Sequence, residues 1–419
     1  MEDRKQQDFD LVVIGGGAAG LMCAATAGEH GLRVLVLDSN EKLGRKLRIT
    51  GKGRCNLTNN CDIKTLLANI PGDGRFLYSS LNAFSPRDTM DWFSERGLAL
   101  KTERGNRVFP VSDRADDVAE TLIRVCKGNG VVFRRAKARA LHSENGAIKA
   151  VIAENGRINR RAAAVCTGGL SYPLTGSTGD GYRFARSFGH TVTELSASLV
   201  PLESDDDWCE QMQGFSLKNV ELSAYEDDRL IYRELGEMLF THFGVSGPLV
   251  LSASAHMKRF ERCSYRLSID LKPGLDDKKL DARLLRDFQT YGKRAFKNAL
   301  DDLAGQSMIP VLVRLSGIDE NKHANELTRE ERLRFLSLLK HFPVSIRGKR
   351  PVDEAVVTAG GVSLKEIDPR TMESKLIRGL FFAGEVLDLD AYTGGFNLQI
   401  AWTTGHAAGL AIAHREEEK

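Results

Sequence analysis

Residues 10–20 read DLVVIGGGAAG, a short apolar run followed at once by a cluster of glycines, and this stretch decides the fold. The run DLVVIG is typical of a strand buried in a parallel sheet. Small and apolar residues then recur at helical spacing up to Gly31, and RVLVLD (33–38) indicates a second buried strand. Together these segments predict a strand–helix–strand unit.

Gly15, Gly17 and Gly20 form the pattern GxGxxG, directly after the predicted strand and at the start of the predicted helix. The first glycine permits a tight turn, the second lets the backbone approach a pyrophosphate, and the third lets helix and strand pack closely. The helix N-terminus presents free N–H groups to the phosphates. Asp38 ends the second strand, where a carboxylate can accept hydrogen bonds from ribose hydroxyls. The pattern predicts a dinucleotide site.

The 419 residues are too many for one ordinary domain, so we expect at least two. Helices are predicted at 86–97 and 115–127. Segments such as VELSAYE and YRLSIDL indicate half-exposed antiparallel strands. Buried strands return in EAVVTAGG (354–361) and GLFFAGEV (379–386), before a helix from about Gly395 to His414. We predict a discontinuous α/β domain (1–192 and 342–419) that is interrupted by an inserted domain. Residues 193–272 form the first part of the inserted β domain. Residues 273–341 form its helical subdomain and the segment with which the chain returns to the inserted domain.

Composition and charge indicate a cytoplasmic globular protein. Hydrophobic residues make up 42% and charged residues 27% of the chain, and no run approaches the roughly 18 apolar residues of a membrane span. The start, MEDRKQQDFD, has no pattern of a secretory signal. Seven scattered cysteines without a CxxC pair favour reduced thiols over disulfides or a metal site. A net charge of +3 permits contact with nucleic acid at the basic clusters 133–139 and 346–350, although solvated faces are commoner.

The C-terminal segment favours a flavin over a nicotinamide as the resident dinucleotide. An NAD dehydrogenase normally continues from the fingerprint into a substrate domain and does not return to its first domain. Here LFFAGEVLD is followed by TGGFNLQIAW, a glycine turn that opens a helix. Such a helix N-terminus would stabilise negative charge on a reduced flavin.

These motifs together resemble the HI0933-like, or aminoacetone-oxidase-like, family of bacterial FAD-binding oxidoreductases. The motifs are GGGAAG, GRKLRITGKGRCNLTN (44–59), TGGLSYPLTGSTGDGY (167–182), THFGVSGP (241–248), TAGGV (358–362) and AGEVLDLDAYTGGFNLQIAW (383–402). The likeness spans the whole chain in order. It implies an α/β FAD domain of the two-dinucleotide-binding type, with an inserted antiparallel β-barrel-like domain that carries a small helical subdomain. Lys52 stands where many relatives have glycine.

The resemblance also implies which residues hold FAD. It assigns the ADP half of FAD to the first glycine turn and Asp38. Arg45, Lys46 and the loop 51–56 are assigned to the pyrophosphate and flavin. Gly384 and Glu385 are assigned to the ribityl and phosphate region, and the last glycine turn to the pyrimidine edge of the ring. The full predicted set is Gly15, Gly17, Ala18, Ala19, Gly20, Asp38, Ser39, Arg45, Lys46, Gly51, Gly53, Arg54, Cys55, Asn56, Thr167, Gly168, Gly169, Gly384, Glu385, Gly395, Asn397 and Leu398.

Three residues are candidates for proton transfer or substrate contact. Cys55 lies in the predicted cofactor loop, either as a small packed residue or as a thiol acid whose pKa an arginine or a helix N-terminus lowers. His242, assisted by Ser246, orients the substrate or donates a proton to it, or else it is a structural histidine that caps a turn. Tyr172 and Tyr392, in glycine turns expected to face the flavin, either stack on a flat substrate or pack in the core.

The resemblance and the single GxGxxG lead to one main functional hypothesis. NAD(P)H would bind transiently in the substrate's cleft and deliver a hydride through the flavin to a conjugated C=C bond. The resemblance offers three substrates: a uridine of ribosomal RNA, an unsaturated steroid or bile acid, and aminoacetone. A hypothesis of another class is a non-catalytic flavin-binding factor associated with RNA.

Overall fold

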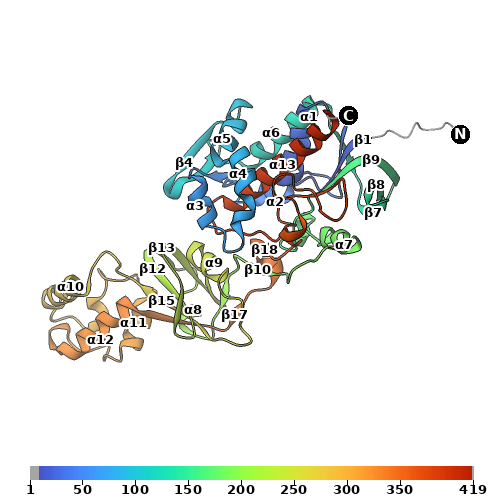
Figure 1. Ribbon diagram of the computed structural model, residues 1–419. Helices are drawn as coiled ribbons and strands as arrows, with labels where there is room; N and C mark the ends of the chain where they lie inside the picture. The colour runs from blue at the N-terminus through green and yellow to red at the C-terminus, as the bar shows by residue number, and fades with distance from the viewer. Residues whose placement is uncertain (1–8, 418–419) are drawn as a thin grey trace. The chain divides into compact units, whose positions relative to one another are not determined.

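The computed structural model describes residues 9–417, and the chain forms two compact units (Figure 1). Unit 1 combines the residues up to Ser198 with those from Val352 onward, and unit 2 is Leu199–Pro351. The charged stretch at positions 1–8, from which we expected no targeting signal, lies outside the described residues. The four-part division predicted from the sequence stays a prediction.

Unit 1 is built on a mixed sheet whose centre is parallel. The strands follow the order β6 (Val132–Arg135), β2 (Val34–Asp38), β1 (Phe9–Ile14), β9 (Gly156–Val165), β8 (Ala147–Ala153) and β7 (Ala138–Glu144). The end of β9 also pairs in parallel with β19 (Leu380–Phe382), whereas its beginning pairs antiparallel with β8. Because a strand from the C-terminal part joins the N-terminal sheet, the predicted discontinuous α/β domain is confirmed.

Two helices of unit 1 pack with their backbones almost in contact. They are α1 (Ala18–Glu29) and α13 (Phe396–Glu417), which lie side by side in Figure 1. A Cβ on Gly405 would stand 2.4 Å from the Ala19 carbonyl oxygen, and one on Gly409 would stand 2.6 Å from that of Cys23. Only glycine permits this approach, which fixes the start of α13 beside the glycine turn.

Shorter elements complete unit 1. The helices are α2 (Arg45–Ile49), α3 (Ile63–Ala68), α4 (Tyr78–Ala83), α5 (Pro86–Glu95), α6 (Ala115–Gly128) and α7 (Asp180–Ser187). β3 (Thr58–Asn59), β5 (Arg107–Pro110) and β4 (Leu100–Glu103) form a small sheet, and β10 (Ser196–Ser198) pairs with β18 (Val357–Ala359). β18 is shorter than the strand predicted at 354–361. It ends at Ala359 because Gly360 and Gly361, with positive φ of 83° and 158°, do not continue the strand. Ser85 is the N-cap of α5 and forms a capping box with Asp88.

Unit 2 has its own antiparallel sheet and its own apolar core. The strand order is β16 (Phe342–Ile346), β15 (Tyr265–Asp270), β12 (Ser216–Glu226), β13 (Arg229–Thr241), β14 (Gly244–Ser246), β11 (Leu202–Glu203) and β17 (Gly348–Lys349). Its helices are α8 (Trp208–Gln211), α9 (Pro248–Ser254), α10 (Asp277–Thr290), α11 (Ile309–Ser316) and α12 (Arg329–Lys340). Figure 1 shows α10, α11 and α12 grouped together at one end of this unit, as expected for a helical subdomain. Within residues 9–417, no helix combines the length and the apolar character that crossing a membrane requires.

Candidate cofactor and active site

The three glycines of the first turn have different surroundings. Gly15 has a φ of 104°, and a Cβ there would lie 2.4 Å from the Cys166 carbonyl oxygen. A Cβ on Gly20 would lie 1.9 Å from the Gly15 carbonyl oxygen, whereas one on Gly17 would meet no atom within 4 Å. The chain itself therefore requires Gly15 and Gly20, while Gly17, the N-cap of α1, faces open space where a phosphate fits.

Asp38 is fixed by the backbone around it. Its Oδ2 accepts a hydrogen bond from the Gly16 N–H at 2.7 Å, and its Oδ1 accepts from the backbone and side-chain nitrogens of Asn40 at 2.7 and 2.9 Å. Asn40 also donates to the Thr175 carbonyl oxygen at 3.0 Å. The carboxylate is thus held in one orientation with lone pairs remaining for hydroxyl donors such as those of a ribose.

A cavity within unit 1 extends from this turn to the start of α13. Fourteen residues of the predicted cofactor set line it: Gly15, Gly17, Ala18, Ala19, Asp38, Ser39, Arg45, Lys46, Thr167, Gly168, Gly384, Glu385, Asn397 and Leu398. The Thr167 hydroxyl is buried without a hydrogen-bond partner, which suits a bound polar ligand. The lining residues come from segments far apart in sequence and fit an extended dinucleotide such as FAD.

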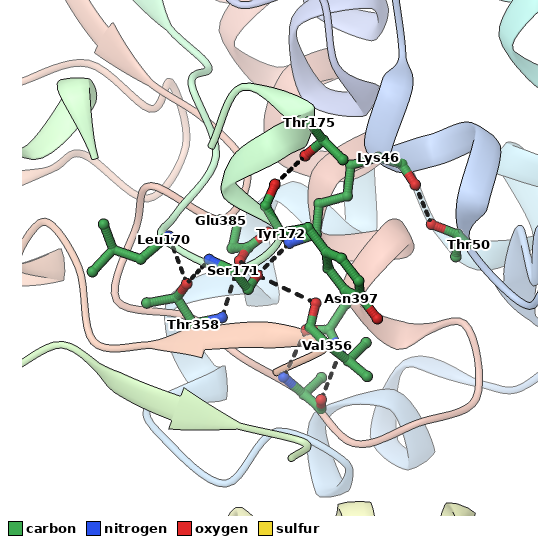
Figure 2. A network of polar contacts seen from close by, with 11 residues as sticks. Lys46, Thr50, Leu170, Ser171, Tyr172, Thr175, Val356, Thr358, Glu385 and Asn397 are labelled. Atoms are coloured by element: carbon green, nitrogen blue, oxygen red, sulfur yellow. Dashed lines mark hydrogen bonds and ion pairs between the residues drawn. The ribbon is translucent and has the colours of Figure 1, made fainter. Parts of the chain in front are cut away.

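An ion pair forms one wall of this cavity (Figure 2). Lys46 Nζ lies 2.7 Å from Glu385 Oε2 and donates to Ser171 Oγ at 2.6 Å, with side chains 26% and 18% exposed for Lys46 and Glu385. The other Glu385 oxygen accepts from Ser171 Oγ and from the Thr358 N–H, both at 3.0 Å. This network joins α2, the loop before α7, β18 and the segment that follows β19 around one carboxylate.

The sequence reasoning missed several lining residues. Lys137, Asp180 and Phe184 line the cavity near the end of β6, and Lys137 Nζ lies 3.0 Å from Asp180 Oδ2. The signal for Asp180 was present, because it stands in the quoted motif TGSTGDGY. Lys137 was hidden in the basic cluster 133–139, which we interpreted only as a nucleic-acid contact or a solvated face.

The remaining predicted cofactor residues do not line this cavity, and their contact with FAD stays a prediction. They are Gly20, Gly51, Gly53, Arg54, Cys55, Asn56, Gly169 and Gly395. The Arg54 guanidinium is bound to Glu103 at 2.5 Å and to Asp113 at 2.6 Å. In the amide orientation that satisfies both groups, Asn56 donates to the Thr58 carbonyl and accepts from the Gly395 N–H. Asn56 therefore holds the last glycine turn in place.

The expectation that the Cys55 thiol has a lowered pKa is wrong. Cys55 is fully buried in the apolar core of unit 1, and burial raises the pKa of its thiol well above the usual value. The structure agrees with the alternative of a small packed residue. Cys55 and Lys52 have φ of 59° and 58°, so two residues of this loop that carry side chains lie in the left-handed region, which favours glycine. This explains why glycine suits position 52.

His242 and Ser246 both belong to unit 2. His242 is exposed in the turn between β13 and β14, and its ring centroid lies 5.0 Å from that of Phe243. Ser246 ends β14 and is half-buried. Their catalytic roles stay predictions.

The basic cluster 346–350 is partly neutralised within unit 2. Arg347 and Arg350 reach the two Glu203 oxygens at 3.0 and 2.9 Å, and Arg347 also pairs with Asp205. These ion pairs hold the pKa of the Glu203 carboxyl below its usual value. A polyanion would compete with carboxylates for these guanidinium groups.

Comparison with known sequences decides the family. The profile of the HI0933-like protein Rossmann domain matches residues 9–411. The chain belongs to the HI0933-like family. It is 31% identical over 401 residues to a ribosomal RNA dihydrouridine synthase of Escherichia coli, covering 95% of this chain and 96% of that protein. It is also 31% identical over 413 residues to a 3-dehydro-bile acid delta(4,6)-reductase of Clostridium scindens, covering 96% and 98%.

The fold of this HI0933-like protein also occurs in solved structures. A 3-ketosteroid delta1-dehydrogenase from Sterolibacterium denitrificans superposes with a TM-score of 0.55 at 12% identity, covering 97% of this chain and all of the other. At this identity the similarity concerns the fold alone. As a member of its family, the chain is an FAD-dependent oxidoreductase.

Proposed function

We propose that the chain is an NAD(P)H-dependent reductase of a conjugated C=C bond, with a uridine of ribosomal RNA as its leading substrate. The main support is the near-full-length similarity to two enzymes that are named for reducing C=C bonds. Formation of dihydrouridine and reduction of a delta(4,6) bile acid have this chemistry in common.

In this proposal the chain's residues hold and orient FAD, which when bound supplies the hydride transfer between donor and substrate. Gly17 and the N-terminus of α1 receive the pyrophosphate, and Asp38 accepts from ribose hydroxyls. Asn397 and Leu398, at the start of α13, meet the pyrimidine edge of the ring. The sequence contains a single GxGxxG, so NAD(P)H would bind transiently where the substrate binds.

We assign the proton that completes the reduction to His242 in the β13–β14 turn, with Ser246 at the end of β14 as its helper. An exposed imidazole can exchange its proton with solvent between turnovers. His242→Ala should lose turnover by about 100-fold or more while it keeps its flavin. Full turnover in this variant would remove the assignment.

A small unsaturated molecule is the second candidate substrate, because the bile-acid reductase is as similar to this chain as the RNA enzyme. Aminoacetone oxidation and a non-catalytic flavin-binding role associated with RNA are further alternatives. An oxidase would take its electrons from aminoacetone and the non-catalytic factor would take none, so neither of these two alternatives requires a flavin that NADH or NADPH reduces.

One experiment separates these possibilities. The visible spectrum of the flavin-loaded protein is recorded anaerobically with NADH or NADPH, and unmodified ribosomal RNA or a cyclic enone is then added. Bleaching that RNA reverses supports the leading proposal, and bleaching that only the enone reverses moves the assignment to small molecules. No bleaching by NADH or NADPH contradicts a reductase. Aminoacetone, added anaerobically in place of NAD(P)H, should then bleach the flavin of an amine oxidase but not that of a non-catalytic protein.

A further inference from the structure

Tyr172 has an unusual backbone conformation beside the cofactor cavity. It lies in the loop 167–179, which contributes Thr167, Gly168, Thr175, Gly176 and Ser177 to the cavity wall. Its φ is 53° and its ψ is 58°, the left-handed region that bulky side chains disfavour. The fold therefore keeps a tyrosine where the backbone alone would favour glycine.

Hydrogen bonds on both sides of Tyr172 hold this conformation. The N–H groups of Leu170 and Ser171 donate to Thr358 Oγ1 at 2.8 and 3.1 Å. After it, the Thr175 N–H and hydroxyl both donate to the Tyr172 carbonyl oxygen, at 2.8 and 2.7 Å. The backbone that carries the ring is thus held before any ligand binds.

The ring itself remains available. Tyr172 is 36% exposed, and Lys46 Nζ lies 5.8 Å from its ring centroid. Figure 2 shows the ring beside the Lys46 side chain, on the side where Val356 lies, and both Lys46 and Val356 line the cavity. Lys46 uses two of its three donors on Ser171 and Glu385, which within the described residues leaves one N–H for an oxygen of a ligand.

We propose that Tyr172 is the residue on which the substrate ring stacks, and that the spare N–H of Lys46 meets a carbonyl oxygen of that ring. A held aromatic ring beside an ammonium group with a free donor recognises a flat ring that carries a conjugated carbonyl. Uracil and a cyclic enone have this feature in common. The inference rests on the proposed function and specifies how that function selects its substrate.

The test compares Tyr172→Ala and Tyr172→Phe with Leu174→Ala, a control in the same loop at a residue that is 84% exposed. Flavin-loaded proteins are assayed for NAD(P)H-dependent reduction of a uridine-containing ribosomal RNA fragment and of cyclohexenone. Each ligand is also titrated without NAD(P)H while the visible flavin spectrum reports binding. We expect Tyr172→Ala to raise KM and Kd about ten-fold or more for the preferred ligand, and the other two variants to stay within about two-fold. Flavin content should not change.

Two results would overturn the stacking role. One is unchanged KM and Kd for both ligands in Tyr172→Ala. The other is a Tyr172→Phe variant that loses kcat at an unchanged KM, because the hydroxyl and not the ring would then act. If the wild-type protein reduces neither ligand, the proposed function fails, yet the spectral titration still tests Tyr172 separately.

Discussion

At the residue scale, the Lys46–Glu385 pair shows how the cavity wall is stabilised. Three segments, which carry Lys46, Ser171 and Thr358, converge on the Glu385 carboxylate, and Lys46 provides its only ion pair among the described residues. A partly buried carboxylate is partly desolvated, and without its cation nothing offsets the free-energy cost of that desolvation. The pair therefore couples the stability of unit 1 to the shape of the cavity.

We predict that Lys46→Met lowers the free energy of unfolding by about 1–2 kcal/mol, less than for a fully buried pair because both side chains retain solvent contact. The double variant Lys46→Met/Glu385→Gln should cost less than the sum of the single variants, since the glutamine amide needs no cation. Denaturant unfolding of the flavin-free proteins measures the complete cycle. Strictly additive costs would show that the two side chains do not depend on each other.

Cys55 gives a second prediction at this scale. Because the thiol is buried and uncharged, Cys55→Ala should keep its flavin, keep turnover within about two-fold, and lose about 1 kcal/mol of stability from the small cavity. The same burial should protect Cys55 from alkylation in the native protein, which mass spectrometry can follow. A variant that keeps its flavin but turns over about 100-fold more slowly would restore the thiol as an acid.

At the scale of elements, the turn between β1 and α1 separates structural from ligand-binding glycines. Gly20→Ala places a Cβ against the Gly15 carbonyl and should destabilise unit 1 by about 3 kcal/mol or prevent folding. Gly17 has an ordinary φ of −85° and open space around it. Gly17→Ala should therefore unfold within about 1 kcal/mol of the wild type but bind FAD poorly.

Calorimetry and flavin titration of these two glycine variants check this prediction. Normal FAD affinity in Gly17→Ala would mean that no phosphate approaches this backbone. A folded and stable Gly20→Ala would mean that α1 can move away from the turn.

Helix α13 carries a pH-dependent group, His406. Its ring stacks on Phe84 with centroids 4.2 Å apart, and its Nδ1 is buried without a partner. Burial, together with the neighbouring His30, lowers the pKa of His406 from 6.5 to about 4. The folded state therefore binds fewer protons than the unfolded chain between these two values.

Because protons then favour the unfolded state, unit 1 should lose stability as the pH falls from about 6.5 to 4. In His406→Phe, which keeps the stacking on Phe84 without a titrating group, this part of the pH dependence should disappear. Melting temperatures of both proteins across this range provide the measurement. Parallel curves would show that other groups control acid stability.

At the scale of the whole molecule, every residue that lines the cavity belongs to unit 1. The chain leaves this unit after β10 and re-enters it before β18, and these strands pair antiparallel with Ser198 opposite Val357. The two ends of the insertion are thus close together in unit 1, and a short connection can join them.

We predict that unit 1, with residues 200–351 replaced by a short glycine–serine linker, folds and binds FAD stoichiometrically. Visible absorbance and a flavin titration measure this, and the same deletion carrying Gly17→Ala serves as the control that should not retain flavin. A folded deletion protein without flavin affinity would show that unit 2 contributes to the cofactor site.

The sequence predicted much of the fold because the signals were local. Period, capping residues and glycine turns are set by neighbours in the chain, so α5, α6 and α13 appeared close to their predicted bounds. The orientation of side chains was less predictable. The motif around Arg54 did not indicate the ion pairs that this side chain makes with Glu103 and Asp113, which are about 50 to 60 residues away in sequence.

By itself, the sequence determined the nucleotide-binding turn, the discontinuous α/β domain with its insertion, and the family, because these depend on motifs that are continuous along the chain. Only the tertiary structure decided which predicted residues meet in one cavity, that Cys55 is buried, and that Lys46, Glu385 and Ser171 form one network beside Tyr172. Burial, pKa and ion pairing depend on neighbours in space, and in the Lys46–Ser171–Glu385 network those neighbours come from segments more than one hundred residues apart.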